Sequence, residues 1–193
     1  MTDGAAGTRA AIMEATFAAL SKHGYADLTI QTIADEFEKS KSLLYYHYET
    51  KDDLLGDFLE FILDAFEAEV DADEGAGPED RLWTVVELLL PPDIAEDEEA
   101  REFRTAIFEL RMQAPYDERY AERFAATDER MIAAVETILA DGVEEGVFDV
   151  DPEADAELLL DTVMGVTLRT VTAGTDDRNP LAPVEALVER FRA

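Results

Sequence analysis

A short stretch near the N-terminus, residues 29–51, constrains the fold of this chain more than any other part. It reads TIQTIADEFEKSKSLLYYHYETK. Thr29 is a residue type that caps helix N-termini, and Ile33 and Phe37 follow it at helical spacing. Ser40 is a second capping residue a few positions later, so the chain has room there for only one tight turn. Two short helices joined in this way must cross rather than continue in line.

The second of these helices is predicted to cover about residues 40–47 and to expose most of its side chains. Leu44 is its one clearly inward residue. The others are hydroxyls, a cation, an imidazole and an apolar side chain, a set suited to DNA phosphates and base edges. Two ordinary amphipathic helices of a bundle are the alternative, but a bundle has no reason to expose Tyr45, Tyr46 and His47 together.

Residues 12–55 closely resemble the N-terminal domain of TetR-family transcriptional regulators. The resemblance covers about a quarter of the chain and rests on matches at fixed offsets, namely Ala15, Gly24-Tyr25, Thr29, Ile33-Ala34, Ser40, Leu44-Tyr45, His47-Tyr48, Lys51 and Leu54. The family usually has glycine where this chain has Glu38, and a small apolar residue where it has Lys39. A positive φ at Glu38 would cost roughly 1 kcal/mol of strain, so the geometry of the turn is an open question.

The resemblance implies a function and a set of contacts. Most members are repressors, so we expect a homodimeric repressor that binds double-stranded DNA. A small, largely apolar effector would release it from an inverted-repeat operator. Ser40 and the residues after it map onto DNA-contacting positions. We expect base contacts from Lys41, Ser42, Leu43 and Tyr45, and phosphate contacts from Thr29, Tyr46, His47 and Lys51.

The net charge of the chain is −30, which is unusual for a DNA-binding protein. Residues 1–50 hold 7 acidic and 4 basic residues, a net of −3, whereas residues 51–193 hold 39 acidic and 12 basic, a net of −27. All four lysines lie within the first 51 residues. A chain so rich in carboxylates and so poor in lysine resembles proteins of extreme halophiles. Lysines kept only near the N-terminus suggest that this part meets phosphate.

The whole chain predicts an all-α fold of about nine helices, with no strand pattern. Residues 1–7 read as a mobile Gly/Ala arm, followed by a helix over 8–23 that Gly24 should end. Further helices are predicted over residues 54–72, 82–90, 103–114, 117–142, 153–173 and from 180 onward. We expect a three-helix DNA-binding domain over residues 1–50 and a helical ligand-binding and dimerisation domain over 51–193.

Composition argues against several other functions. Cysteine is absent, and histidine occurs only at positions 23 and 47, so no cofactor or metal site is expected. No catalytic constellation is visible, which disfavours an enzyme. No apolar run approaches the ~18 residues of a membrane span and no signal segment is present, so we expect a cytoplasmic protein. A helical adaptor that acts through its acidic surface is the alternative to a regulator, and duplex binding in molar KCl would separate the two.

Residues 51–193 contain more large apolar side chains than thin helices need for cohesion. Most read as ordinary core, but the resemblance implies that some line a ligand pocket. The candidates are Phe58, Phe61, Ile62, Phe66, Trp83, Phe103, Ile107, Phe108, Arg111 and Phe124. Glu109 and Arg111 interrupt an apolar helix and are predicted to orient a ligand or to pair with each other.

Gly165 lies inside an apolar helix, where it costs ~1 kcal/mol relative to alanine. Close approach of another helix would compensate for this cost, either within the chain or across a two-fold axis. The helix over 153–173 is apolar nearly all round, so we expect it to be buried on nearly all sides and to pair with its symmetry mate. The predicted dimer interface comprises Asp161, Gly165, Leu168, Arg169, Val184, Leu187, Val188 and Phe191.

Overall fold

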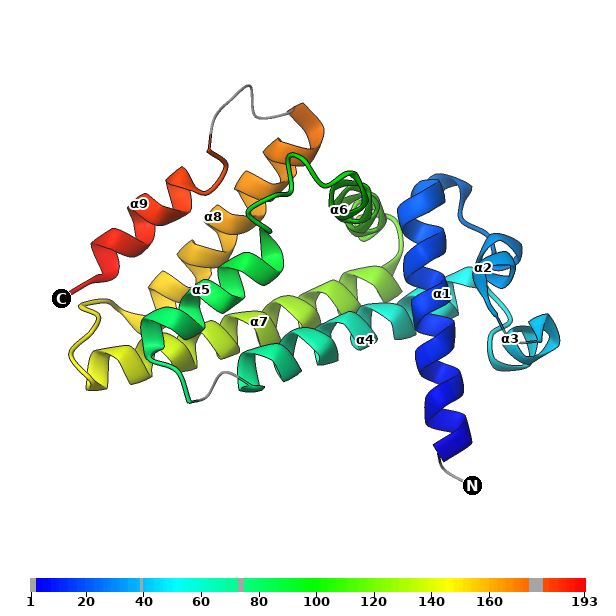
Figure 1. Cartoon of the computed structure of the whole chain (residues 1–193), viewed down its shortest axis with the longest axis horizontal. Coiled ribbons are helices and arrows are strands. Elements are labelled where there is room, and N and C mark those ends of the chain that lie inside the picture. Colours follow the sequence, from blue (N-terminus) through cyan, green and yellow to red (C-terminus); the bar gives the residue numbers. More distant parts are fainter. Residues whose placement is uncertain (1–2, 39, 73–74, 174–178) are drawn as a thin grey trace. The chain divides into compact units, whose positions relative to one another are not determined.

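The computed structural model describes residues 3–38, 40–72, 75–173 and 179–193, with side chains from residue 7 onward. This part of the chain forms nine helices and an isolated antiparallel bridge between Phe148 and Arg192 (Figure 1). The helices are α1 (Asp3–Asp27), α2 (Ile30–Glu36), α3 (Lys41–His47), α4 (Lys51–Ala72), α5 (Pro78–Leu89), α6 (Glu98–Arg111), α7 (Glu118–Glu144), α8 (Pro152–Ala173) and α9 (Ala182–Phe191). The predicted all-α class is confirmed.

Helix α1 begins earlier than the sequence predicted. It starts at Asp3, so residues 3–7, expected as an arm, continue the helix. Alanine has the best intrinsic helix propensity, which favours this extension. The regular helix is broken at Gly24, where the sequence predicted its end, because the φ of 66° at this position is available to glycine at little cost. Beyond this kink, α1 continues to Asp27.

Helices α2 and α3 form the predicted helix-turn-helix. The Thr29 hydroxyl accepts from the Thr32 backbone N–H at 3.1 Å, and the Thr32 hydroxyl accepts from the Thr29 N–H at 2.9 Å, which closes a capping box. Ser40 is the N-cap of α3, but its hydroxyl lies 2.6 Å from that of Ser42 and does not cap the helix. Phe37 and Ser40 have extended backbone, while Lys39 lies outside the described residues.

The chain divides into two compact units. The first comprises Met1–Ile62 and Glu102–Phe124, and the second Leu63–Arg101 and Ala125–Ala193. Helices α4, α6 and α7 therefore contribute residues to both units. Packing joins a segment of α6 and α7 to the N-terminal helices, whereas the domain boundary after residue 50 remains a prediction.

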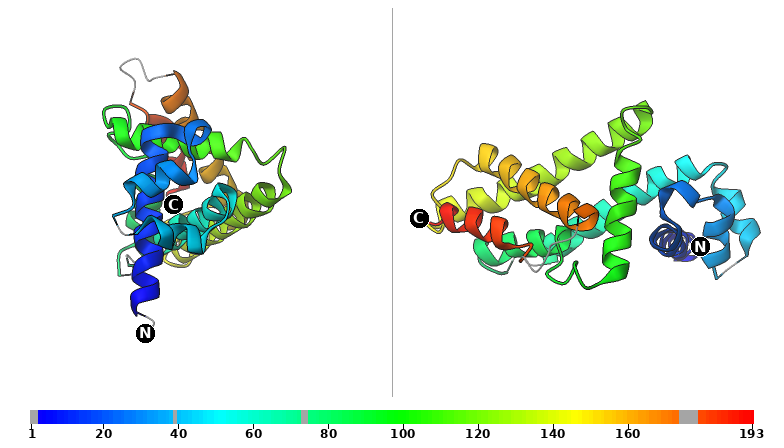
Figure 2. Two further views of the ribbon diagram at one scale, coloured as in Figure 1. Left: turned by 90° about the vertical axis from the view of Figure 1, so that its right-hand side faces the viewer. Right: turned by 90° about the horizontal axis from the view of Figure 1, so that it is seen from above.

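Each unit has its own apolar core. The core of the first unit includes Met13, Leu20, Ile33, Leu44, Leu54, Phe58, Leu110 and Phe124. The core of the second includes Leu82, Val86, Leu139, Leu159, Val163, Val184, Val188 and Phe191. Within the second unit, α8 and α9 run side by side in opposite directions (Figure 2). Near the end of α7, Gly142 permits close packing of the segment that follows, because a Cβ at this position would lie 2.1 Å from the Phe148 ring.

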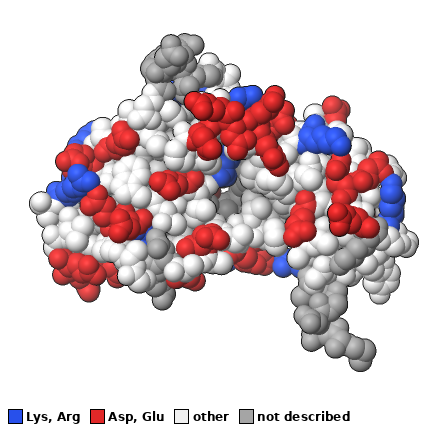
Figure 3. Space-filling view, viewed as in Figure 1, with Lys and Arg blue, Asp and Glu red and all other residues white. Residues whose placement is uncertain are grey.

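Acidic side chains dominate the surface. On the face drawn in Figure 3, Asp and Glu form extended patches, whereas Lys and Arg occur as separate spots. None of the described helices is both long enough and apolar enough to cross a lipid bilayer.

Candidate nucleic-acid interface

Helix α3 exposes one side and anchors the other. Leu44 is fully buried in the core of the first unit, and Leu43 is half-buried against the same core. The exposed side chains include Tyr46, with 83% of its surface accessible, and Tyr45, with 48%. The remaining exposed residues are Ser40, Lys41, Ser42 and His47. The structure thus brings these polar and aromatic groups onto one short helix, as the sequence predicted.

Side chains of α2 contact the exposed side of α3. The Tyr45 hydroxyl donates to Gln31 Oε1 at 3.1 Å, and Gln31 Nε2 donates to Asp35 Oδ1 at 2.8 Å. Lys41 Nζ donates to the same oxygen of Asp35. Sequence reasoning did not single out Gln31 or Asp35, although their spacing of four residues places them on one face of α2.

The lysines near the N-terminus have partners within the chain. Lys22 pairs with Glu36 at 2.6 Å, Lys41 pairs with Asp35, and Lys51 binds backbone carbonyls. The fourth, Lys39, lies outside the described residues. Pairing within the fold therefore also accounts for lysines near the N-terminus, and their contact with phosphate stays a prediction.

Lys51 supports the end of α1. Its Nζ donates to the carbonyl oxygens of Tyr25 at 3.3 Å and Leu28 at 3.2 Å, and lies 4.3 Å from the centroid of the Tyr25 ring. Carbonyls at a helix C-terminus lack intrahelical partners and carry partial negative charge, so an ammonium group is favourable there. The Thr29 hydroxyl likewise supports the fold, because it caps the N-terminus of α2. Both residues, predicted as phosphate contacts, have side chains engaged in the fold.

Tyr25 is also held by α6. Its backbone N–H donates to Glu109 Oε2 at 2.9 Å, beside Gly24, where a Cβ would lie 3.2 Å from that oxygen. Glu109 was predicted to orient a ligand or to pair with Arg111. In the structure Glu109 binds the backbone of Tyr25, and the Arg111 guanidinium lies 5.1 Å from the centroid of the Phe124 ring. A role of either residue toward a ligand stays a prediction.

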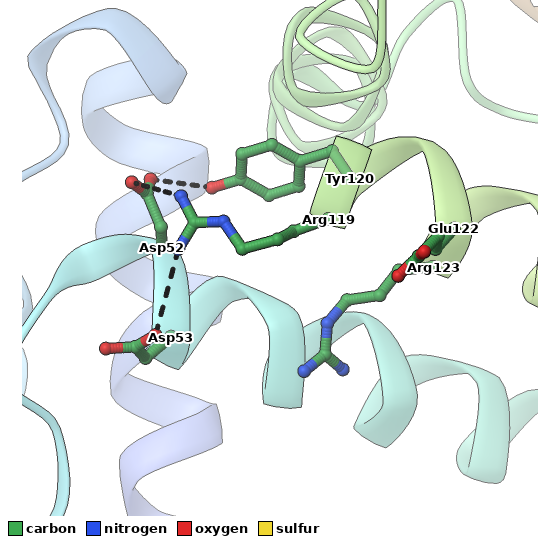
Figure 4. Close-up of a pocket in the computed structure, with 6 residues that line it drawn as sticks. All are labelled: Asp52, Asp53, Arg119, Tyr120, Glu122 and Arg123. Carbon is green, nitrogen blue, oxygen red and sulfur yellow. Dashed lines mark hydrogen bonds and ion pairs between the residues drawn. The ribbon is translucent and has the colours of Figure 1, made fainter. Parts of the chain in front are cut away.

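The first turns of α4 and α7 meet in the first unit. The Tyr120 hydroxyl donates to Asp52 at 2.8 Å, and Arg119 reaches toward Asp52 and Asp53 (Figure 4). Burial, together with the bond to Asp52, raises the pKa of Tyr120. These groups line a polar pocket of about 280 Å³ with Glu122 and Arg123.

Tyr48, directly after α3, is tied to α4. Its hydroxyl donates to Asp57 at 2.9 Å. Burial, and next the bond to this carboxylate, raise the pKa of Tyr48 to about 12. The hydroxyl therefore stays protonated at neutral pH and holds the C-terminal end of the helix-turn-helix to α4.

The predicted pocket residues are distributed over both units. Phe58, Phe61, Ile62, Phe103, Ile107 and Phe124 gather in or against the core of the first unit. The Phe103 ring lies 4.5 Å from that of Phe17 and 6.3 Å from that of Phe58, centroid to centroid. Phe66 and Trp83 instead pack in the core of the second unit, and Phe108 and Arg111 are half-buried.

The predicted dimer residues fall into two groups. Asp161, Gly165, Leu168 and Arg169 are exposed on α8, so this helix is not buried on nearly all sides within one chain. Among the residues that the structure describes, no heavy atom would lie within 4 Å of a Cβ at Gly165, so no helix crossing in this part of the chain explains the glycine. In contrast, the apolar stripe of α9 is buried in the core of its own unit, and its part in a dimer interface stays a prediction. These residues are Val184, Leu187, Val188 and Phe191.

Comparisons with known proteins agree with this fold. Residues 12–57 match the family described as "Bacterial regulatory proteins, tetR family", and residues 78–193 match "BetI-type transcriptional repressor, C-terminal". The chain is 34% identical over 163 residues to the HTH-type transcriptional repressor SCO4008 of Streptomyces coelicolor, covering 79% of this chain and 74% of that protein.

Two solved structures illustrate the structural likeness. A TetR transcription regulator from Haloarcula marismortui has a TM-score of 0.81 and 36% identity, with coverage of 97% of this chain and 100% of that one. A transcriptional regulator from Saccharomonospora viridis, crystallised with choline, has a TM-score of 0.77 and 20% identity, with 95% of each chain covered. The second likeness concerns the fold alone.

Proposed function

This chain belongs to the TetR family of transcriptional regulators, and from that membership we propose that its α3 reads an inverted-repeat operator in the major groove. As a member of this family it is a DNA-binding, ligand-responsive transcriptional repressor and not an enzyme. We propose that it acts in the cytoplasm, together with the DNA that it regulates.

The exposed side of α3 is the observation that carries the proposal. A seven-residue helix, anchored by Leu44, displays two tyrosines, a histidine, a lysine and a serine to solvent. The exposed tyrosine rings do not contribute to core packing. Their hydroxyls, together with the imidazole and ammonium groups, can bond to phosphates and base edges. We propose DNA contacts from Ser40, Lys41, Ser42, Leu43, Tyr45, Tyr46 and His47. Thr29 and Lys51 support the helices that present them.

We propose that the exposed face of α8 forms the dimer contact. This face presents Leu158 and Leu168, which are 48% and 43% exposed, on either side of Gly165. Asp161 and Arg169 lie one turn before and after Gly165, so a two-fold axis there would bring opposite charges together. A two-fold dimer would then place one α3 in each of two major grooves about one helical turn, ~34–36 Å, apart.

The effector is proposed to be a small, largely apolar molecule bound by residues 51–193. The aromatic side chains around Phe58 and Phe103 supply the apolar surface for such a molecule. Choline is a ligand of the Saccharomonospora viridis protein of similar fold. Quaternary ammonium compounds bind aromatic faces well, so they are the first effectors to test.

Selection from a random duplex library in molar KCl tests the function. The recovered sequences should share two inverted half-sites, and addition of effector candidates should release them. An adaptor that acts only through its acidic surface would enrich no sequence. Recovery of a single, asymmetric motif would leave DNA binding in place and contradict the two-fold arrangement.

A further inference from the structure

The outer face of α2 carries two polar side chains that hold the side chains we assign to DNA reading. These are Gln31 and Asp35, named here the α2 clamp. Tyr45 Oη donates to Gln31, Gln31 donates to Asp35, and Lys41 donates to the same carboxylate. The four side chains form one continuous chain of contacts, which begins and ends on α3 and passes through α2.

From this geometry we propose that the α2 clamp positions Tyr45 and Lys41 and weakens binding to DNA of the wrong sequence. Gln31 and Asp35 act as positioning residues, through side chains of the neighbouring helix. The inference rests on the proposed function, because it requires Lys41 and Tyr45 to meet DNA.

The carboxylate of Asp35 reduces the electrostatic gain that any DNA can obtain from Lys41. Non-specific binding comes almost entirely from cations that neutralise phosphates and release counterions. Lys41 is already neutralised by Asp35, and both side chains are about half exposed, so a phosphate must compete with a carboxylate for the same ammonium group. A cognate site offsets this loss with hydrogen bonds to base edges, which a wrong sequence does not offer.

Gln31 restricts the Tyr45 side chain before DNA arrives. Its two amide ends have different partners, since Oε1 accepts from Tyr45 and Nε2 donates to Asp35. The amide is therefore oriented from both sides, and the Tyr45 hydroxyl is held although the ring is 48% exposed. Ordering one such side chain in advance corresponds to roughly two- to tenfold in affinity.

The test of Asp35 compares a duplex selected by the wild-type protein with a shuffled duplex of the same composition. Affinities are measured by fluorescence anisotropy over a KCl series. Asp35→Asn keeps the size of the side chain and removes its charge, which frees Lys41 for phosphate. For the shuffled duplex, the slope of log K against log[KCl] should be more negative in Asp35→Asn than in the wild type, by about 0.9. The preference for the selected duplex should decrease.

Glu36→Gln is the matched control, because it removes one carboxylate from the same helix and frees Lys22 rather than Lys41. For the shuffled duplex, the salt slope of Glu36→Gln should lie closer to that of the wild type than the slope of Asp35→Asn does. An equal change in slope in both variants would mean that net charge, not the Lys41–Asp35 pair, governs non-specific binding, and would overturn this part of the inference.

A double-mutant cycle tests Gln31. Gln31→Leu should weaken binding to the selected duplex roughly two- to tenfold and leave the shuffled duplex unaffected. In a Tyr45→Phe background, which lacks the hydroxyl, the same change should cause little further loss. Full additivity would show that Gln31 does not act through Tyr45. Circular dichroism of each variant verifies that the helices are retained.

The outcomes separate this inference from the function on which it rests. If the wild-type protein does not distinguish the selected from the shuffled duplex, the proposed function fails and the inference fails with it. If the wild type discriminates and the Asp35→Asn and Gln31→Leu variants discriminate equally well, only the inference is overturned.

Discussion

At the scale of single residues, chemically similar side chains have different tasks according to their partners. Lys41 lies on the exposed side of α3 and pairs with an exposed carboxylate, so DNA can reach it. Lys51 donates to two backbone carbonyls and lies over the Tyr25 ring, so its charge supports the fold. A count of lysines near the N-terminus does not distinguish these roles, whereas the contacts do.

Loss of Tyr45 or Lys41 should remove specific DNA binding. Both side chains lie on the exposed part of α3, away from the buried Leu44, so Tyr45→Ala and Lys41→Ala should leave the fold and the dimer intact. Each lost base contact should cost ~1–3 kcal/mol. Fluorescence anisotropy with a selected duplex measures the loss, and affinities equal to wild type in both variants would refute the assignment.

The titration of Asp35 should report its pairing with Lys41. The hydrogen bond from Lys41, and next the one from Gln31, lower the pKa of Asp35 below its ordinary value of 3.8. A carboxyl with a lowered pKa stabilises the folded state above its ordinary pKa, and that contribution is lost as pH falls through the folded value. In an NMR titration of the carboxyl carbon, Lys41→Met should raise the midpoint toward 3.8. A midpoint that does not move would exclude the ion pair in solution.

At the scale of elements, the junction of α1 with α4 depends on groups far apart in the sequence. Lys51 and Asp52, in the first turn of α4, contact Tyr25 near the end of α1 and Tyr120 in α7. Glu109 of α6 holds the backbone of Tyr25 from another direction. The first compact unit therefore includes segments of α6 and α7, because their side chains complete its core and its polar contacts.

Removal of the Lys51 ammonium should destabilise this unit. Lys51→Met preserves much of the aliphatic stem but leaves two carbonyl oxygens without this donor, and should lower the free energy of unfolding by ~1–2 kcal/mol. Lys22→Met breaks a pair whose lysine side chain is 62% exposed, and should cost less than ~1 kcal/mol. Urea unfolding in molar KCl compares the two, and equal small losses would argue against a structural role for Lys51.

At the scale of the whole molecule, the exposed face of α8 and the acidic surface both bear on assembly. A Cβ at Gly165 would meet no heavy atom within 4 Å among the described residues, so we expect a second copy of the chain to compensate for this glycine. Gly165→Leu should force two copies apart at the axis, with ~1–3 kcal/mol of overpacking per site. Analytical ultracentrifugation should then detect monomer and a loss of DNA binding. Ala68→Leu, at an exposed position of α4, is the control, and a Gly165→Leu protein that dimerises like wild type would refute the interface.

The stability of the dimer should rise with salt. Residues 51–193 carry a net charge of −27, so two copies repel each other unless counterions screen them. The Debye length falls from about 30 Å at 0.01 M to about 3 Å at 1 M ionic strength. Sedimentation across a KCl series should therefore show the dimer tightening over a range in which most DNA-binding proteins lose affinity. A dimer that is tightest at low salt would contradict this electrostatic account.

The sequence by itself determined the helix-turn-helix, the all-α class and the separation of charge along the chain. These follow from local rules, since caps such as Thr29, apolar spacing such as Ile33 and Phe37, and the break at Gly24 act within a few residues. The family resemblance rests on the same short segment, which is why it was visible before any packing was known.

Only the tertiary structure decided what each apolar or charged side chain meets. Periodicity identified the apolar stripe of α9, which includes Val188, but not that the core of its own unit buries it. It identified Gly165, but not that the described residues leave the space beside this glycine open. The bond from Tyr25 to Glu109 joins residues 84 positions apart. Such contacts depend on how distant elements pack, because burial and pairing are properties of the folded surface and not of the spacing within one helix.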